Sequence, residues 1–160
     1  MGPHVVMDSL SRSYEHQGDN LYIPRYATSA VVVIQGVKPG ESPLNTVVWV
    51  AVGYPDSALM IPVPVTEDDH IPAGFKRTPD NVLCEACELS LKVKKDIFPE
   101  GSKGPVDFES ANASRGFMQE LERGVSDEFI GLFDSYVSGS ISYGSYLQKY
   151  DQMSVLYIEK

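Results

Sequence analysis

The stretch from Ala27 to Pro55, ATSAVVVIQGVKPGESPLNTVVWVAVGYP, decides the fold of this chain. Two runs rich in Val, Ile, Thr and Trp, which fit a pleated sheet, flank a connection that holds Pro, Gly, Glu and Ser. This pattern predicts a β-hairpin. Both faces of its first arm are apolar, because Val31 and Val33 point one way while Val32 and Ile34 point the other. A sheet that is apolar on both faces needs a layer on each side.

A third apolar segment, Ala58–Val65, follows turn residues at 54–57 and extends the hairpin to an antiparallel meander. Pro62 and Pro64 lack backbone N–H donors, and their spacing of two places both missing amides on the same side. We therefore expect this strand at an edge of the sheet.

The second half of the chain changes to a helical period. Thr78-Pro79-Asp80 offers an N-cap, a first-turn proline and an early acid, so we predict a helix over Pro79–Ile97. After a loop at 98–105, apolar residues spaced three and four apart predict one or two amphipathic helices over Ser114–Val137, divided at Gly124–Asp127. Residues 138–160 are expected to form a further helix.

Strands followed by helices predict an α+β fold, in which helices cover an antiparallel sheet. The 160 residues fit a single domain or part of one. We divide it into a lead-in over 1–20, antiparallel strands over 21–66, a helix over 78–98 and a helical C-terminal part over 107–160. Only one side's helices are predicted, so we expect the helix over Pro79–Ile97 on one face and the opposite face exposed or covered by another chain.

Composition excludes several classes of partner. The 13 basic and 22 acidic residues give a net charge of −9, which disfavours nucleic acid and anionic membranes. No apolar stretch approaches the length of a membrane span. The first residues lack the pattern of a signal peptide, and the compartment stays open. A small molecule or another protein is the expected partner, and no cofactor or metal is predicted.

Arg25, just before the first strand, is the candidate catalytic residue. A guanidinium fixed at the mouth of a strand can hold a carboxylate or a developing oxyanion with two hydrogen bonds. The alternative is a surface cation at a strand end. Trp49, the single tryptophan, is expected in the core, with an acyl pocket as the alternative.

The remaining candidates are weaker. Cys84 and Cys87 have C-x-x-C spacing, but they fall within the predicted helix, and no second pair or nearby His accompanies them. We interpret them as small apolar residues and not as a redox or zinc site. His4, His16 and His70 are scattered, and residues 67–70 are expected to form a solvated acidic loop.

Several motifs carry a resemblance to a known family. Residues 22–26 (YIPRY), 33–41 (VIQGVKPGE) and 49–55 (W-x-x-x-G-Y-P) resemble the C-terminal part of the linear amide hydrolases. These are cysteine N-terminal-nucleophile enzymes related to penicillin acyltransferase and choloylglycine hydrolase. Residues 83–86 and 116–130 are similar to the closing helices of that family.

The resemblance implies a four-layer αββα fold and a nucleophilic cysteine that self-cleavage exposes as the first residue of the mature chain. The α-amine of that cysteine activates its own thiol. In this sequence Met1 comes first, and neither Cys84 nor Cys87 can take that part. Arg25 matches an active-site arginine of the family. The family's other polar site groups, an Arg, an Asp and an Asn, are expected upstream of Met1.

Two hypotheses follow. In the first, the chain is the C-terminal segment of a hydrolase or acyltransferase that acts on a small amide or acyl substrate, and another segment or chain supplies the cysteine. In the second, it is a noncatalytic truncated module or pseudoenzyme that acts through protein–protein association. Both predict that the 160-residue chain alone is inactive as an amidase.

Overall fold

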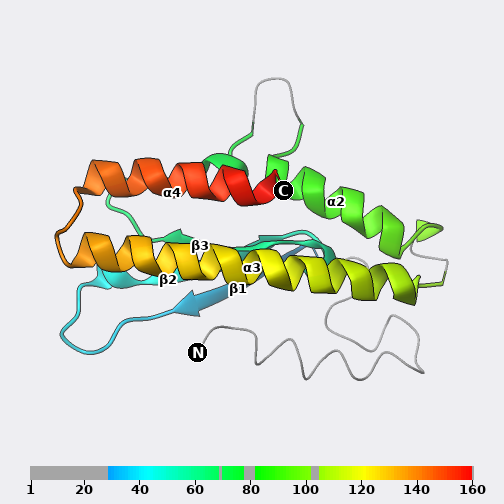
Figure 1. Ribbon diagram of the computed structural model, residues 1–160, viewed down its shortest axis with the longest axis horizontal. Helices are drawn as coiled ribbons and strands as arrows, with labels where there is room; N and C mark the ends of the chain where they lie inside the picture. Colours follow the sequence, from blue (N-terminus) through cyan, green and yellow to red (C-terminus); the bar gives the residue numbers. More distant parts are fainter. Residues whose placement is uncertain (1–28, 69, 78–81, 102–104, 160) are drawn as a thin grey trace.

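The computed structural model describes residues 29–68, 70–77, 82–101 and 105–159 (Figure 1). Within them the chain forms a three-stranded antiparallel sheet followed by three helices, which is an α+β arrangement. Arg25, His4 and His16 lie outside the described residues. None of the described helices combines the length and apolar character that crossing a membrane requires.

The sheet has the predicted meander topology. Its strands are β1 (Ala30–Gln35), β2 (Val47–Val52) and β3 (Met60–Pro64), in the order β1-β2-β3. The register places Val33 opposite Trp49 and Trp49 opposite Pro62. The expected hairpin and the expected edge position of the proline-containing strand are therefore both confirmed.

The first helix starts later than the sequence predicts. Helix α2 spans Glu85–Ile97, and Cys84 is its N-cap residue with extended backbone angles. An antiparallel bridge between Arg77 and Cys84 holds this residue extended, so the helix begins only after it. The predicted start at Pro79 is wrong, since Val82 and Leu83 lie before the helix; residues 78–81 are outside the described part.

Helix α3 (Phe108–Val137) is one continuous helix, so the predicted division at Gly124–Asp127 is wrong. It also begins six residues before Ser114, because the Asp107 side chain caps it by accepting the Ser110 N–H at 3.1 Å. Gly124 does not interrupt the helix; it allows close packing against the neighbouring helix. A Cβ there would lie 2.9 Å from the Tyr157 ring of the next helix, so the missing side chain allows close approach.

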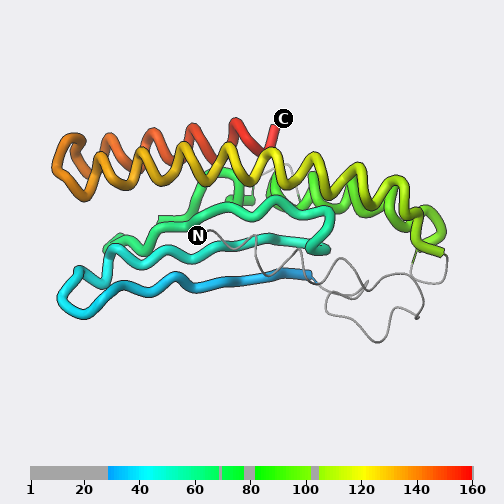
Figure 2. The backbone as a smooth tube through the Cα atoms, turned by 60° about the horizontal axis from the view of Figure 1, so that its bottom comes forward, coloured from blue at the N-terminus to red at the C-terminus, as the bar shows by residue number. Residues whose placement is uncertain are grey.

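Helix α4 (Tyr143–Ile158) confirms the helix expected in the C-terminal tail. Ser142 caps its start, and Gly139, with φ of 76°, takes the left-handed conformation in the turn after α3. Helices α3 and α4 run side by side along the sheet (Figures 1 and 2).

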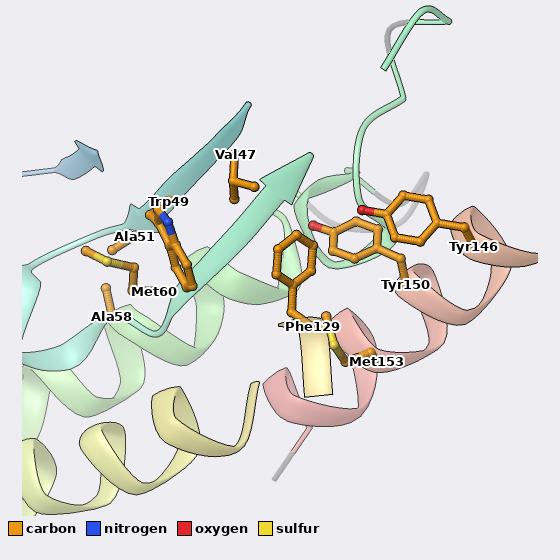
Figure 3. Close-up of a cluster of buried hydrophobic side chains, with 9 residues drawn as sticks. All are labelled: Val47, Trp49, Ala51, Ala58, Met60, Phe129, Tyr146, Tyr150 and Met153. Atoms are coloured by element: carbon orange, nitrogen blue, oxygen red, sulfur yellow. The ribbon is translucent and has the colours of Figure 1, made fainter. Parts of the chain in front are cut away.

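The main core lies between the sheet and these two helices (Figure 3). Trp49 is only 6% exposed and packs edge-on against Phe129 of α3, with 6.3 Å between ring centroids. The core position expected for Trp49 is confirmed. The buried members of this core come from β2, β3 and the segment between them, from α3 and from α4: Val47, Trp49, Ala51, Ala58, Met60, Phe129, Tyr146, Tyr150 and Met153.

Helix α2 packs at one end of this arrangement and not across the sheet. Its Ala86 joins a second cluster with Leu59, Ile61, Leu121 and Ile158. The expectation that the helix over Pro79–Ile97 lies on one face of the sheet is met in part, because α2 contacts β2 and packs on Ile61 of β3, whereas α3 and α4 provide most of the cover. Their apolar residues face the buried side of β2 and β3.

Burial falls from one edge of the sheet to the other. Four of the five residues of β3 are buried, β2 alternates between buried and partly exposed residues, and β1 has no fully buried residue. Figure 2 shows the reason: β3 lies next to the helices and β1 lies farthest from them. The sheet therefore extends out from under the helical layer.

Candidate functional site

The predicted catalytic residue cannot be placed in this structure. Arg25 precedes the described residues and lies five positions before the start of β1 at Ala30. Its catalytic role therefore remains a prediction. The described residues do, however, define the surfaces around β1, the strand that follows Arg25 in the sequence.

The first such surface is the bare face of the sheet. We use this name for the side chains of Val32, Ile34, Val48, Val50 and Val52, which the strand register places on one face. Val32 is 56% exposed and Ile34 is 69% exposed. The three β2 valines are partly exposed. Ile61 of β3 lies opposite Val50 on the same face, but it is fully buried in the cluster with Ala86 of α2 and Leu121 of α3. The bare face is therefore the β1–β2 part of this side of the sheet.

The outer edge of β3 is closed by side chains from the helices. The Met60 N–H donates to Glu122 Oε1 at 3.2 Å, and the Tyr150 hydroxyl donates to the Pro62 carbonyl at 2.7 Å. Pro62 and Pro64 have no N–H to offer. Burial raises the pKa of Glu122 to about 7, although the Met60 hydrogen bond acts in the opposite direction. This edge cannot accept another strand.

The outer edge of β1 is open by comparison. Among the described residues it pairs with β2 alone, so its outer backbone groups face no further strand. An open strand edge is a template for pairing with another segment or chain. The bare face and the open edge meet on β1. Among the described strands, β1 is therefore the one with both an uncovered apolar face and an unpaired outer edge.

Two pockets lie on the helical side of the sheet. The larger, about 410 Å³, is bordered by Trp49 and Phe129 together with polar residues that include Arg123 and Asp127. The Trp49 indole N–H donates to Gln35 Oε1 at 3.1 Å, which fixes the ring. Trp49 therefore belongs to the core and also borders this pocket; its alternative role in an acyl pocket stays a prediction.

The smaller pocket, about 260 Å³, lies beside the turn between α3 and α4 and is walled by aromatic rings. Tyr136 stacks on Tyr146 with 4.7 Å between ring centroids. Among the described residues the buried Tyr146 hydroxyl has no hydrogen-bond partner, whereas Tyr150 donates to Pro62. Figure 3 shows both hydroxyl groups directed away from α4. Burial raises the pKa of Tyr146.

The predicted acidic loop is anchored to α4. Glu67 and Asp68 are exposed, as expected, but the Tyr143 hydroxyl donates to Asp68 Oδ1 at 2.6 Å and lowers the pKa of that carboxyl. His70 Nε2 lies 2.9 Å from Asp151 Oδ1. Sequence reasoning missed this pair, because 81 positions separate the two residues and no local pattern joins them.

The C-x-x-C cysteines lie close together at the start of α2. Cys84 Sγ is 3.3 Å from Cys87 Sγ, and both residues are partly buried. The sequence argument placed them in the middle of a helix, and that placement is wrong because Cys84 is the N-cap residue. In the described part of the chain no three His, Cys, Asp or Glu residues are placed to hold a metal ion.

Comparisons with known proteins give no relative to guide these assignments. No family model, curated protein or solved structure matches this chain. The function is therefore argued from the residues and surfaces described above.

Proposed function

We propose that this chain is the C-terminal part of an amide hydrolase of the cysteine N-terminal-nucleophile type. Its bare face would pack on a second sheet that carries the nucleophilic cysteine. The observation that supports this proposal best is the bare face itself. A sheet with helices over one face, and with exposed apolar side chains on the β1–β2 part of the other face, resembles the layers of one half of an αββα sandwich.

The resemblance of residues 22–26, 33–41 and 49–55 to the linear amide hydrolases supplies the chemistry of the proposal. In such an enzyme the thiol of the first residue attacks the amide carbonyl, and its α-amine takes the proton. The carbonyl oxygen gains negative charge in the tetrahedral intermediate. We assign Arg25 to stabilising that charge or to orienting the cysteine, since it lies five positions before the strand on which the bare face and the open edge meet.

The first test is the mass of the natural gene product together with its activity. The proposal predicts a longer precursor that contains a Cys-initiated segment, self-cleavage, and hydrolysis of simple acyl amides. In that protein, Arg25→Ala should lower the rate by about 100-fold to 1000-fold, because a donor to the oxyanion is lost. Arg25→Lys should recover little, since lysine lacks the planar fork.

Arg115→Ala is the matched control for the loss of a guanidinium. Arg115 lies in the helical layer and pairs with Asp56 at 3.6 Å, a partly exposed ion pair of little energetic weight. It should leave the rate within about twofold of wild type. Near wild-type rates and self-cleavage for both Arg25 variants would overturn the role assigned to Arg25.

The second test addresses the bare face. Val32→Lys in the full-length protein should block assembly and self-cleavage, since a buried lysine without a partner is costly. Val82→Lys, at a site that is 78% exposed and lies before α2, is the control and should be silent. Equal tolerance of both substitutions would contradict sheet packing on the bare face.

The open edge of β1 favours a second candidate function, a noncatalytic module that pairs with a partner strand. A natural product that starts at Met1 and lacks hydrolysis of acyl amides would support the module over the enzyme.

A further inference from the structure

The start of α2 brings the two cysteines into a redox-competent arrangement. Cys84 occupies the N-cap position and Cys87 lies in the first turn of the helix. The bridge between Arg77 and Cys84 fixes the backbone just before the helix. In the sequence, a helix start at 78–82 stands where a strand is expected before the cysteines of a redox motif, which argues against such a motif. The structure starts the helix at Glu85 and pairs Cys84 with Arg77 in an isolated bridge.

The two sulfur atoms lie close to bonding distance. The two Sγ atoms are 3.3 Å apart. A disulfide requires about 2.05 Å, so rotation about the side-chain bonds has to close little more than about 1 Å. Both side chains are only partly buried, so a small oxidant can reach them.

The surroundings of the two thiols differ. Burial and the contact with Cys84 raise the pKa of Cys87 to about 11, so Cys87 is a thiol at neutral pH. Cys84 is the N-cap residue, and its side chain makes no capping hydrogen bond to the helix backbone. Because Cys87 is held as a thiol beside it, Cys84 is the attacking sulfur and Cys87 the resolving one.

We infer that Cys84 and Cys87 form a reversible redox pair that is oxidised to an intramolecular disulfide by exchange with a disulfide-containing substrate. The Cys84 thiolate attacks one sulfur of the substrate disulfide, and the other sulfur leaves as a thiolate. The Cys87 thiol then loses its proton and attacks Cys84 Sγ, which releases the second substrate thiolate. Two electrons pass from the cysteines to the substrate, and two protons are released from the cysteines. This inference does not depend on the proposed amide hydrolysis.

Intact mass spectrometry of the folded 160-residue chain tests the pair directly, because Cys84 and Cys87 are its only cysteines. The reduced chain is incubated with oxidised glutathione at pH 7.5. We expect a loss of about 2 Da without a lasting glutathione adduct, and full reversal by dithiothreitol. Cys87→Ser should trap a glutathione adduct of about 305 Da on Cys84, because the resolving thiol is missing.

The opposite variant and the unfolded chain are the controls. Cys84→Ser should form its adduct on Cys87 at least tenfold more slowly than Cys87→Ser forms its adduct on Cys84. The chain in guanidinium should oxidise more slowly than the folded chain, since folding holds the sulfurs together. A folded wild-type chain that keeps both thiols, or that keeps a glutathione adduct, would overturn the inference. Equal adduct rates in the two variants would overturn the assigned order of attack.

Discussion

The two edge strands of the sheet have opposite surroundings although their sequences are similarly apolar. Strand β3 lies against α3 and α4, with Ile61 fully buried and Glu122 and Tyr150 bonded to its outer backbone groups. Strand β1 projects from the helical layer, and Ile34 is 69% exposed. Two strands of similar apolar content can thus be buried to very different degrees. The sequence of a strand alone does not tell which other element covers it. The described helices bury β3 at its outer edge and on both of its faces, and they leave β1 without a fully buried residue.

Substitutions on the two faces of the sheet should differ most in their effect on the free energy of unfolding. Trp49→Ala removes a buried ring from the core and is expected to cost about 3–5 kcal/mol of unfolding free energy. Ile34→Ala on the bare face should change the stability of the isolated chain by at most about 0.5 kcal/mol. Urea unfolding followed by circular dichroism measures both. A cost above about 2 kcal/mol for Ile34→Ala would show that this face is already packed.

The closed edge of β3 should make stability depend on pH through Glu122. The folded-state pKa of this carboxyl is raised to about 7, so the folded protein binds its proton more tightly than the unfolded chain does. The stabilising contribution is complete below the unfolded pKa of about 4.5 and is lost as pH rises through about 7. The full difference is about 3 kcal/mol by linkage.

Glu122→Gln isolates this effect because the amide oxygen can still accept the Met60 N–H. The variant should be less dependent on pH between 5 and 8 than the wild type, as judged by urea unfolding at each pH. Glu120→Gln, which removes an exposed carboxyl from the same helix, should follow the wild type. Parallel curves for all three proteins would contradict a partly buried Glu122 with a raised pKa.

Replacement by phenylalanine should affect stability differently at Tyr146 and at Tyr150, two neighbouring tyrosines of α4. Tyr150→Phe leaves the Pro62 carbonyl without its donor and is expected to cost about 1–2 kcal/mol. Tyr146→Phe removes a buried hydroxyl that has no partner among the described residues, so it should be neutral or stabilising by up to about 1 kcal/mol. Thermal unfolding of the pair measures the contrast. A cost for Tyr146→Phe equal to that of Tyr150→Phe would indicate a bonded hydroxyl.

Much of the fold could be predicted from local sequence. The hairpin, the edge position of the proline-containing strand, the core position of Trp49 and the C-terminal helix followed from periodicity and turn residues. The start of α2 could not, because a bridge between Arg77 and Cys84 overrides the capping signal at Thr78. The continuity of α3 could not either, since Gly124 is needed for contact with Tyr157 of another helix.

The candidate site was less accessible to sequence reasoning. The bare face was expected from the apolar residues on both sides of the first strand, and the structure shows it uncovered among the described residues. Arg25 stays a prediction because it lies outside them. The C-x-x-C spacing is plain in the sequence, but the helical period of the surrounding residues predicts both cysteines inside a helix. Only the helix boundary, which depends on tertiary contacts, places Cys84 at the N-terminus.

Hydroxyl-radical footprinting of the bare face tests the central claim most directly. Side-chain oxidation of Val32 and Ile34 is compared between the isolated 160-residue chain and the intact natural protein, with Val82 and Leu156 as exposed references. If a second sheet packs on the bare face, Val32 and Ile34 are oxidised readily in the isolated chain and protected in the intact protein, while the references react equally in both. Equal oxidation of Val32 and Ile34 in the two samples would contradict the account.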